Sequence, residues 1–98
     1  MEEYLTIGET EQAIEWNNKG SSLINLGRYA EALPYFDKAL KIDPNFKDAW
    51  NDKGLCLINL ERYEEAIVCY DKALKIDPDD KKAWFYKGVC LDILGRQE

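Results

Sequence analysis

The sequence predicts an all-α protein, built as a solenoid of antiparallel helix-turn-helix hairpins. Three observations carry this prediction. Tryptophan recurs every 34 residues, at Trp16, Trp50 and Trp84; apolar residues within each unit follow a helical period; and an Asp-Pro pair ends each second helix. Residues 13–46 and 47–80 are identical at 20 of 34 positions, which is far more than chance gives.

The first helix of each unit has its apolar residues on one face of a 3.6-residue period. In the second unit these residues are Trp50, Gly54, Leu57 and Ile58, at offsets of zero, four, seven and eight. The segment that follows suits a short helix-helix turn, and Gly27 is available in the first unit for a left-handed C-terminal cap.

The second helix of the second unit is expected from about Tyr63 to Ile76. It ends at Asp77-Pro78 because the residue before a proline is pushed out of the helical region. Residues 80–95 then predict one more first helix, with Asp79 or Asp80 as its cap. One hairpin cannot bury both of its apolar faces, so stability must come from stacking neighbouring hairpins.

Composition excludes several classes of function. The 98 residues fit one domain, and 13 basic against 19 acidic residues give a net charge of −6, so we expect no binding to nucleic acid or to anionic membranes. The chain has no histidine and no glycine-rich phosphate loop, so we predict no enzyme activity, no catalytic residues and no cofactor.

The cysteines and the first residues of the chain bear on metal binding and location. Cys56, Cys69 and Cys90 form no C-x-x-C pair, so we predict buried, reduced thiols and no metal site. Residues 1–4 hold two acids and no basic segment, and no apolar segment follows them, so a secretory signal is not expected. We therefore predict a cytoplasmic protein.

The repeat resembles the tetratricopeptide repeat (TPR) in its period and in six residues at fixed offsets. These residues are Trp16, Gly20, Ala32, Phe36, Ala39 and Pro44 in the first unit and Trp50, Gly54, Ala66, Tyr70, Ala73 and Pro78 in the second, while Trp84 and Gly88 open a third. The resemblance implies a right-handed α-solenoid and a protein-interaction scaffold. It divides a single domain, residues 1–98, into an N-terminal extension (1–9), repeat 1 (13–46), repeat 2 (47–80) and a half repeat (81–96).

One departure from the family pattern recurs in every unit. The family's usual leucine before the glycine is replaced by Lys19, Lys53 and Lys87. We expect each lysine to lay its aliphatic stem along the core and to keep its ammonium group in solvent.

The resemblance also implies a binding groove, because the first helices of TPR proteins line a concave surface that holds a peptide. The corresponding residues are Asn17, Ser21 and Ile24 in repeat 1, Asn51, Leu55 and Ile58 in repeat 2, and Lys82, Phe85 and Val89 in the last helix. The asparagines could bond a peptide backbone, with apolar residues as the floor. The alternative is that both asparagines are simply solvated helix positions.

A subclass of the family clamps the C-terminal carboxylate of chaperones. At the clamp positions this sequence carries Asn17, Ser21, Asp52, Lys82 and Tyr86, and only Lys82 matches. Because Asp52 would repel a carboxylate, we predict that the chain does not bind chaperone tails.

The two ends of the array differ. Where later units carry Ala49 and Cys56 on the face toward a preceding hairpin, repeat 1 carries Glu15 and Ser22, as a solvated first unit would. The last helix instead keeps apolar residues, which predicts an interaction site. We expect self-association through Trp84, Leu91 and Leu94; the alternatives are that another partner covers this face or that the chain is a fragment of a longer array.

Overall fold

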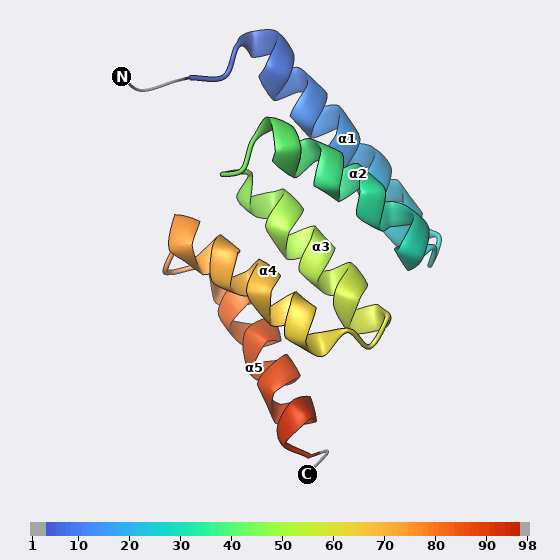
Figure 1. The fold of residues 1–98 in the computed structure, drawn as a ribbon, viewed down its shortest axis with the longest axis vertical. Helices are drawn as coiled ribbons and strands as arrows, with labels where there is room; N and C mark the ends of the chain where they lie inside the picture. The colour runs from blue at the N-terminus through green and yellow to red at the C-terminus, as the bar shows by residue number, and fades with distance from the viewer. Residues whose placement is uncertain (1–3, 97–98) are drawn as a thin grey trace.

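The computed structural model describes residues 4–96, and this part of the chain contains five helices and no strand. They are α1 (Ile7–Asn25), α2 (Tyr29–Ile42), α3 (Lys47–Asn59), α4 (Tyr63–Ile76) and α5 (Lys81–Gly95), joined by short turns (Figure 1). The predicted all-α solenoid of helical hairpins is confirmed.

The helices form two hairpins and one additional helix. α1 packs against α2 and α3 against α4, while α5 packs mainly on α4. In Figure 1, α2 and α4 lie in front of α1 and α5, so the second helices form one side of an elongated plate of 47 × 32 × 17 Å. The first helices α1, α3 and α5 line the other side.

The beginning of α1 is defined by a capping box. The Thr6 hydroxyl accepts from the Glu9 backbone at 3.0 Å, and the Glu9 carboxylate accepts from the Thr6 backbone at 3.1 Å. α1 therefore starts at Ile7, inside the segment that the sequence assigned to an N-terminal extension over residues 1–9. Residues 1–3 of that segment lie outside the described residues.

The two hairpin turns have the same backbone shape but different residues. Gly27 takes the left-handed conformation at φ 74°, as predicted, and its amide bonds the Ile24 carbonyl at 2.8 Å. In the second turn the left-handed residue is Glu61, at φ 59°. A side chain there is strained, because only glycine adopts this conformation without a steric cost.

The Asp-Pro pairs end α2 at Ile42 and α4 at Ile76, as predicted. The proline carbonyls also explain why a tryptophan follows each Asp-Pro pair six residues later. The Trp50 indole donates to the Pro44 carbonyl at 2.8 Å, and the Trp84 indole donates to the Pro78 carbonyl at 2.7 Å. Each tryptophan thus fixes the chain between two repeats.

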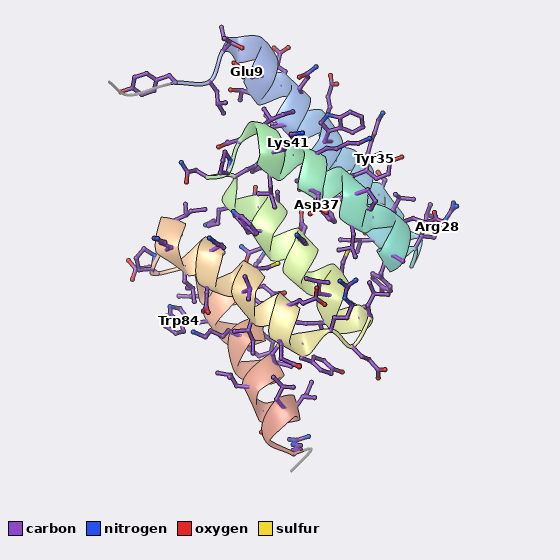
Figure 2. All side chains as sticks on the ribbon, viewed as in Figure 1. Glu9, Arg28, Tyr35, Asp37, Lys41 and Trp84 are labelled. Carbon is purple, nitrogen blue, oxygen red and sulfur yellow. The ribbon has the colours of Figure 1, made fainter. Side chains whose placement is uncertain are left out.

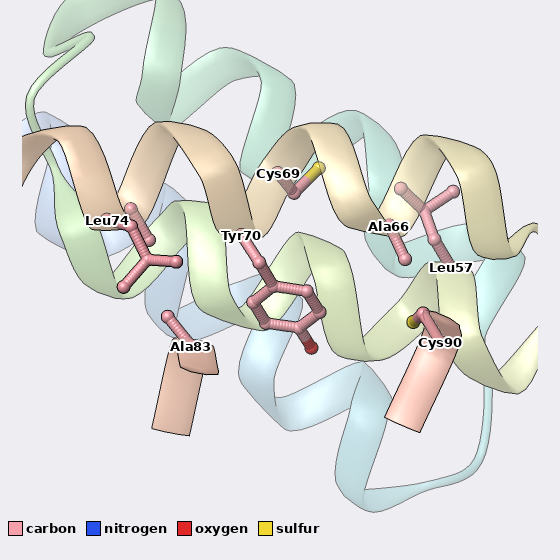
Figure 3. Close-up of a cluster of buried hydrophobic side chains, with 8 residues drawn as sticks. Leu57, Ala66, Cys69, Tyr70, Leu74, Ala83 and Cys90 are labelled. Carbon is pink, nitrogen blue, oxygen red and sulfur yellow. The ribbon is translucent and has the colours of Figure 1, made fainter. Parts of the chain in front are cut away.

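The core of each hairpin is built on a close contact between a glycine and an aromatic ring. A methyl group added at Gly20 would lie 2.6 Å from the Phe36 ring, and one added at Gly54 would lie 2.6 Å from the Tyr70 ring. Both rings are fully buried. Figure 3 shows Tyr70 at the centre of the larger cluster, with Ala83 and Cys90 of α5 facing it.

The recurring lysines connect neighbouring repeats. Lys53 pairs with Asp37 at 2.8 Å and Lys87 pairs with Asp71 at 2.7 Å, in each case across to the second helix of the preceding unit. The sequence predicted an ammonium group in solvent, and for these two lysines that prediction missed the ion pair. All three lysines also lie over the tryptophan of their own unit, at 4.9 Å from the ring centroid for Lys19, 5.9 Å for Lys53 and 5.6 Å for Lys87.

The three cysteines are buried free thiols, as predicted. Burial raises the pKa of Cys56 to about 12 and the pKa of Cys69 to about 11, so both thiols stay protonated. Among residues 4–96, no group of three or more histidine, cysteine, aspartate or glutamate side chains is arranged to hold a metal ion. No described helix is long and apolar enough to span a membrane.

Candidate functional site

The candidate site is the surface formed by α1, α3 and α5. This surface contains a pocket of about 600 Å³ at the amino-terminal ends of α3 and α5. The nine residues that line the pocket are all polar or charged: Asn17, Lys47, Asp48, Asn51, Asp52, Asp79, Asp80, Lys81 and Lys82.

Polar contacts between the three helices hold the pocket in shape. The Ser21 hydroxyl of α1 donates to Asp52 of α3 at 3.3 Å, and the Asn51 amide of α3 donates to Asp80 at 2.8 Å. Lys47 reaches the carboxylates of Asp77 at 3.0 Å and Asp80 at 3.4 Å. The floor of the pocket is therefore fixed by side chains from successive repeats.

Asp80 is the structural anchor of this network. Its carboxylate caps α5 by accepting from the backbone of Lys82 at 3.0 Å and of Ala83 at 3.4 Å, which confirms the predicted helix cap. Burial opposes ionisation of this group, but hydrogen bonds from Asn51 and Ala83 and the charge of Lys47 outweigh it and lower the Asp80 pKa. Asp80 is thus an ionised carboxylate whose acceptor capacity is already used.

Asp52 has a different environment. Desolvation is the largest influence and raises its pKa, and the nearby charge of Asp48 acts in the same direction. Hydrogen bonds from Ser21 and Asn17 and the charge of Lys82 oppose the rise without cancelling it. Within the described residues Asp52 has no salt bridge.

The two predicted asparagines are not solvated helix positions. Asn17 is only 7% exposed, and Asn51 is half-buried. The side-chain oxygens of both residues are buried and have no hydrogen-bond partner among the described residues. A buried amide oxygen without a partner is costly, so these positions have unused hydrogen-bonding capacity.

Only part of the predicted groove lines the pocket. Of the nine residues, Asn17, Asn51 and Lys82 do so. Ser21 contributes through its bond to Asp52. The apolar members do not line this pocket: Ile24, Leu55, Ile58 and Val89 are half-buried, whereas Phe85 is exposed and meets Tyr86 edge-on with the ring centroids 5.2 Å apart.

The residues predicted for self-association lie on α5. Trp84 is 54% exposed and Leu91 is 53% exposed, whereas Leu94 is half-buried. Figure 2 places Trp84 at the margin of the molecule, beside α4. The face of α5 between Trp84 and Leu91 is open at Gly88, where an added methyl group would meet nothing within 4 Å.

Sequence reasoning missed Asp48 and Lys47 as parts of the site. The signal for Asp48 was present, because Asp48 and Asp52 are four residues apart and therefore share one face of a helix. Lys47 carried no such signal, since its partners Asp77 and Asp80 belong to the next inter-repeat turn.

The comparisons with known proteins agree with this geometry. The model of the tetratricopeptide repeat family matches residues 23–87, which is well over half of the chain. The chain therefore belongs to the tetratricopeptide repeat family. Proteins of this family commonly mediate protein–protein interaction, and they are typically non-catalytic scaffolds. None of the curated proteins matches the chain.

Solved structures show the same fold. The second TPR of Spaghetti, bound to the HSP90 peptide SRMEEVD, is 21% identical with a TM-score of 0.86, over 91% of this chain and 82% of that one. The Arabidopsis OM64 TPR domain is 19% identical with a TM-score of 0.86, over 90% and 73%. MamA from Desulfovibrio magneticus is 27% identical with a TM-score of 0.82, over 87% of this chain and 48% of that one. The chain thus spans about half the length of the matched MamA chain.

Proposed function

We propose that the chain is a protein-binding module that holds a peptide segment of a partner protein in the groove lined by α1, α3 and α5. The observation that carries the proposal is the pocket of about 600 Å³ whose buried amide oxygens, on Asn17 and Asn51, have no partner. An arriving peptide offers backbone amides, which are the donors that such oxygens lack. The Spaghetti structure, which holds a peptide, supports this use of the fold.

The groove has a polar part and a more apolar part. The pocket is polar, while Leu55 and Ile58 lie further along α3, toward its carboxyl end, and are half-buried. A peptide lying along α3 would therefore place a polar segment at the pocket and an apolar side chain near Ile58.

The proposed partner is not an acidic chaperone tail. The clamp position in α3 is Asp52, a partly desolvated carboxylate with Asp48 one turn away. A terminal carboxylate placed here would meet like charge, and Lys82 alone would have to offset it. We therefore expect the HSP90 peptide SRMEEVD, which Spaghetti binds, to show no saturable binding to this chain.

The test of the main proposal is selection from a phage-displayed library of random dodecapeptides, followed by calorimetry on synthetic copies of the selected peptides. We expect Asn51→Ala to weaken binding about tenfold or more, because it removes a groove contact and frees Asp80. Asn25→Ala, an exposed asparagine at the far end of α1, is the matched control and should leave binding unchanged. Selected peptides that bind both variants as well as the native chain would contradict the groove proposal.

A second candidate function is self-association through α5. It is favoured by the exposure of Trp84 and Leu91, which lie two helical turns apart on one face with the open position Gly88 between them. A second copy offers the same face, so two α5 helices could pack against each other in a symmetric dimer. We expect light scattering to show a mass that rises with concentration and that returns to the monomer in Trp84→Asp or Leu91→Asp. A monomer at all concentrations contradicts this candidate.

A further inference from the structure

Four aspartates and three lysines line the pocket, so its formal charge is negative. Asp48 and Asp52 lie one turn apart on α3, and within the described residues neither carboxylate forms a salt bridge. The Ser21 hydroxyl lies at 3.3 Å from Asp52, which is a long contact for a bond between oxygens. Asp52 is therefore a partly buried negative charge that Ser21, Asn17 and Lys82 only partly offset.

The asparagines add further acceptors at the same place. Asn17, from α1, is more than nine-tenths buried, lines the pocket and has an unpartnered side-chain oxygen. The Asn51 amide nitrogen is bonded to Asp80, which leaves its oxygen as the unpartnered atom. Because a carboxylate can only accept, this bond fixes which end of the Asn51 amide is the donor.

In the described part of the chain, the lysines around the pocket form no salt bridge with the carboxylates of Asp48 and Asp52. Lys47 already forms salt bridges with Asp77 and Asp80. Lys81 and Lys82 are exposed, and of these Lys82 acts on Asp52 through its charge alone, without a salt bridge. The floor of the pocket therefore attracts a cation that brings hydrogen-bond donors.

We propose that this pocket binds a basic side chain, arginine in preference to lysine, of the partner peptide. This inference rests on the proposed peptide-binding function and specifies the partner chemistry. A guanidinium group carries five donors in a planar fork, so it can pair with the Asp52 carboxylate and also donate toward the asparagine oxygens. Lysine supplies the charge without the fork and binds more weakly.

The proposal has a consequence for pH. Because desolvation raises the Asp52 pKa, a bound cation lowers it again, and binding releases a proton over the range in which free Asp52 is partly protonated. Affinity should therefore fall as the pH falls through the Asp52 pKa. The charged and titratable groups that act on Asp52 are Asp48 and Cys56 of α3, Tyr70 of α4 and Lys82 of α5.

The experiment uses the full chain and the peptides selected from the random dodecapeptide library. We expect these peptides to share an arginine or lysine at one position. Changing that residue to glutamine should weaken binding to the native chain about tenfold or more, but should have little effect on binding to Asp52→Asn. Glu64→Gln, an exposed acid on α4, removes the same charge away from the pocket and should behave as the native chain does.

The outcomes separate this inference from the function on which it rests. Peptides that depend on Asn51 but show no basic residue, or whose basic residue is not coupled to Asp52, overturn the inference and leave groove binding intact. A library that yields no groove-dependent peptide overturns both. Asp52→Asn keeps the size of the side chain and the acceptor for Ser21, and circular dichroism shows whether it folds.

Discussion

The complete hairpin of α3 and α4 and the unpaired helix α5 carry the same repeat pattern in different surroundings. The pattern reads Trp50, Gly54 and Leu57 in α3 and Trp84, Gly88 and Leu91 in α5. α4 covers the first set, so Leu57 is 2% exposed and Gly54 meets a ring, whereas Leu91 is 53% exposed and Gly88 meets nothing. The repeat pattern therefore specifies which positions a neighbouring helix can bury. Whether those positions are buried depends on the presence of that helix.

The largest expected difference between the two regions concerns their leucines. Leu57→Ala should lower the free energy of unfolding by about 2–4 kcal/mol, because it leaves a cavity in the buried cluster. Leu91→Ala should cost less than about 1 kcal/mol, since that side chain is half in solvent already. Urea unfolding at low protein concentration measures both changes. Equal losses would mean that the α5 face is covered in solution.

The glycines should respond in opposite directions. Gly54→Ala should destabilise the protein by about 1–3 kcal/mol, because its methyl group would overlap the Tyr70 ring. Gly88→Ala should stabilise it by about 0.5–1 kcal/mol, because alanine favours the helix and nothing lies within 4 Å of the added methyl group. Thermal unfolding of both variants gives the comparison. A loss at Gly88 would reveal that another surface packs there.

The ring over Gly54 should matter more than its hydroxyl group. The Tyr70 hydroxyl is buried without a partner among the described residues, and repeat 1 has Phe36 at the equivalent position. Tyr70→Phe should therefore raise the free energy of unfolding by about 1 kcal/mol, since it removes an unsatisfied polar group. Phe36→Tyr is the reverse control and should lower it. Destabilisation by Tyr70→Phe would indicate that a buried water bonds the hydroxyl.

The smallest expected effect is in the turn between α3 and α4. Glu61→Gly should stabilise the hairpin by about 0.5 kcal/mol, because it relieves the left-handed strain at φ 59° and this gain exceeds the added entropy of the unfolded chain. Gly27→Ala introduces the same strain into the first turn and should destabilise by about 1 kcal/mol. Chemical denaturation of the pair measures both. If Glu61→Gly loses stability, the side chain makes a favourable contact in solution.

Much of the fold could be predicted from the sequence because its signals are local or repeat along the chain. The period in Trp16, Trp50 and Trp84 indicated the units, and the Asp-Pro pairs marked the ends of α2 and α4. The start of α1 was harder, since the capping box of Thr6 and Glu9 lies before the first repeat residue. The ion pairs of the recurring lysines could not be predicted from one unit, because each one joins two units.

The candidate site was predicted mainly where the family pattern names positions. That pattern placed Asn17, Asn51 and Lys82 on one surface, and all three line the pocket. The same pattern also named Phe85 as a groove residue, but Phe85 is exposed and does not line the pocket. The pattern gave no reason to expect an unpartnered oxygen on Asn17, because burial of that side chain depends on the packing of α1 against α3.

By itself, the sequence determined the helices, their turns and the small residues at each crossing, because helix period, proline geometry and side-chain volume act within one unit. Only the tertiary structure decided which copies of the pattern are buried and which polar groups lack partners. The burial of a side chain and the satisfaction of its hydrogen bonds depend on which residues the next helix places against it. For this reason Gly54 and Gly88, alike in sequence, have opposite surroundings.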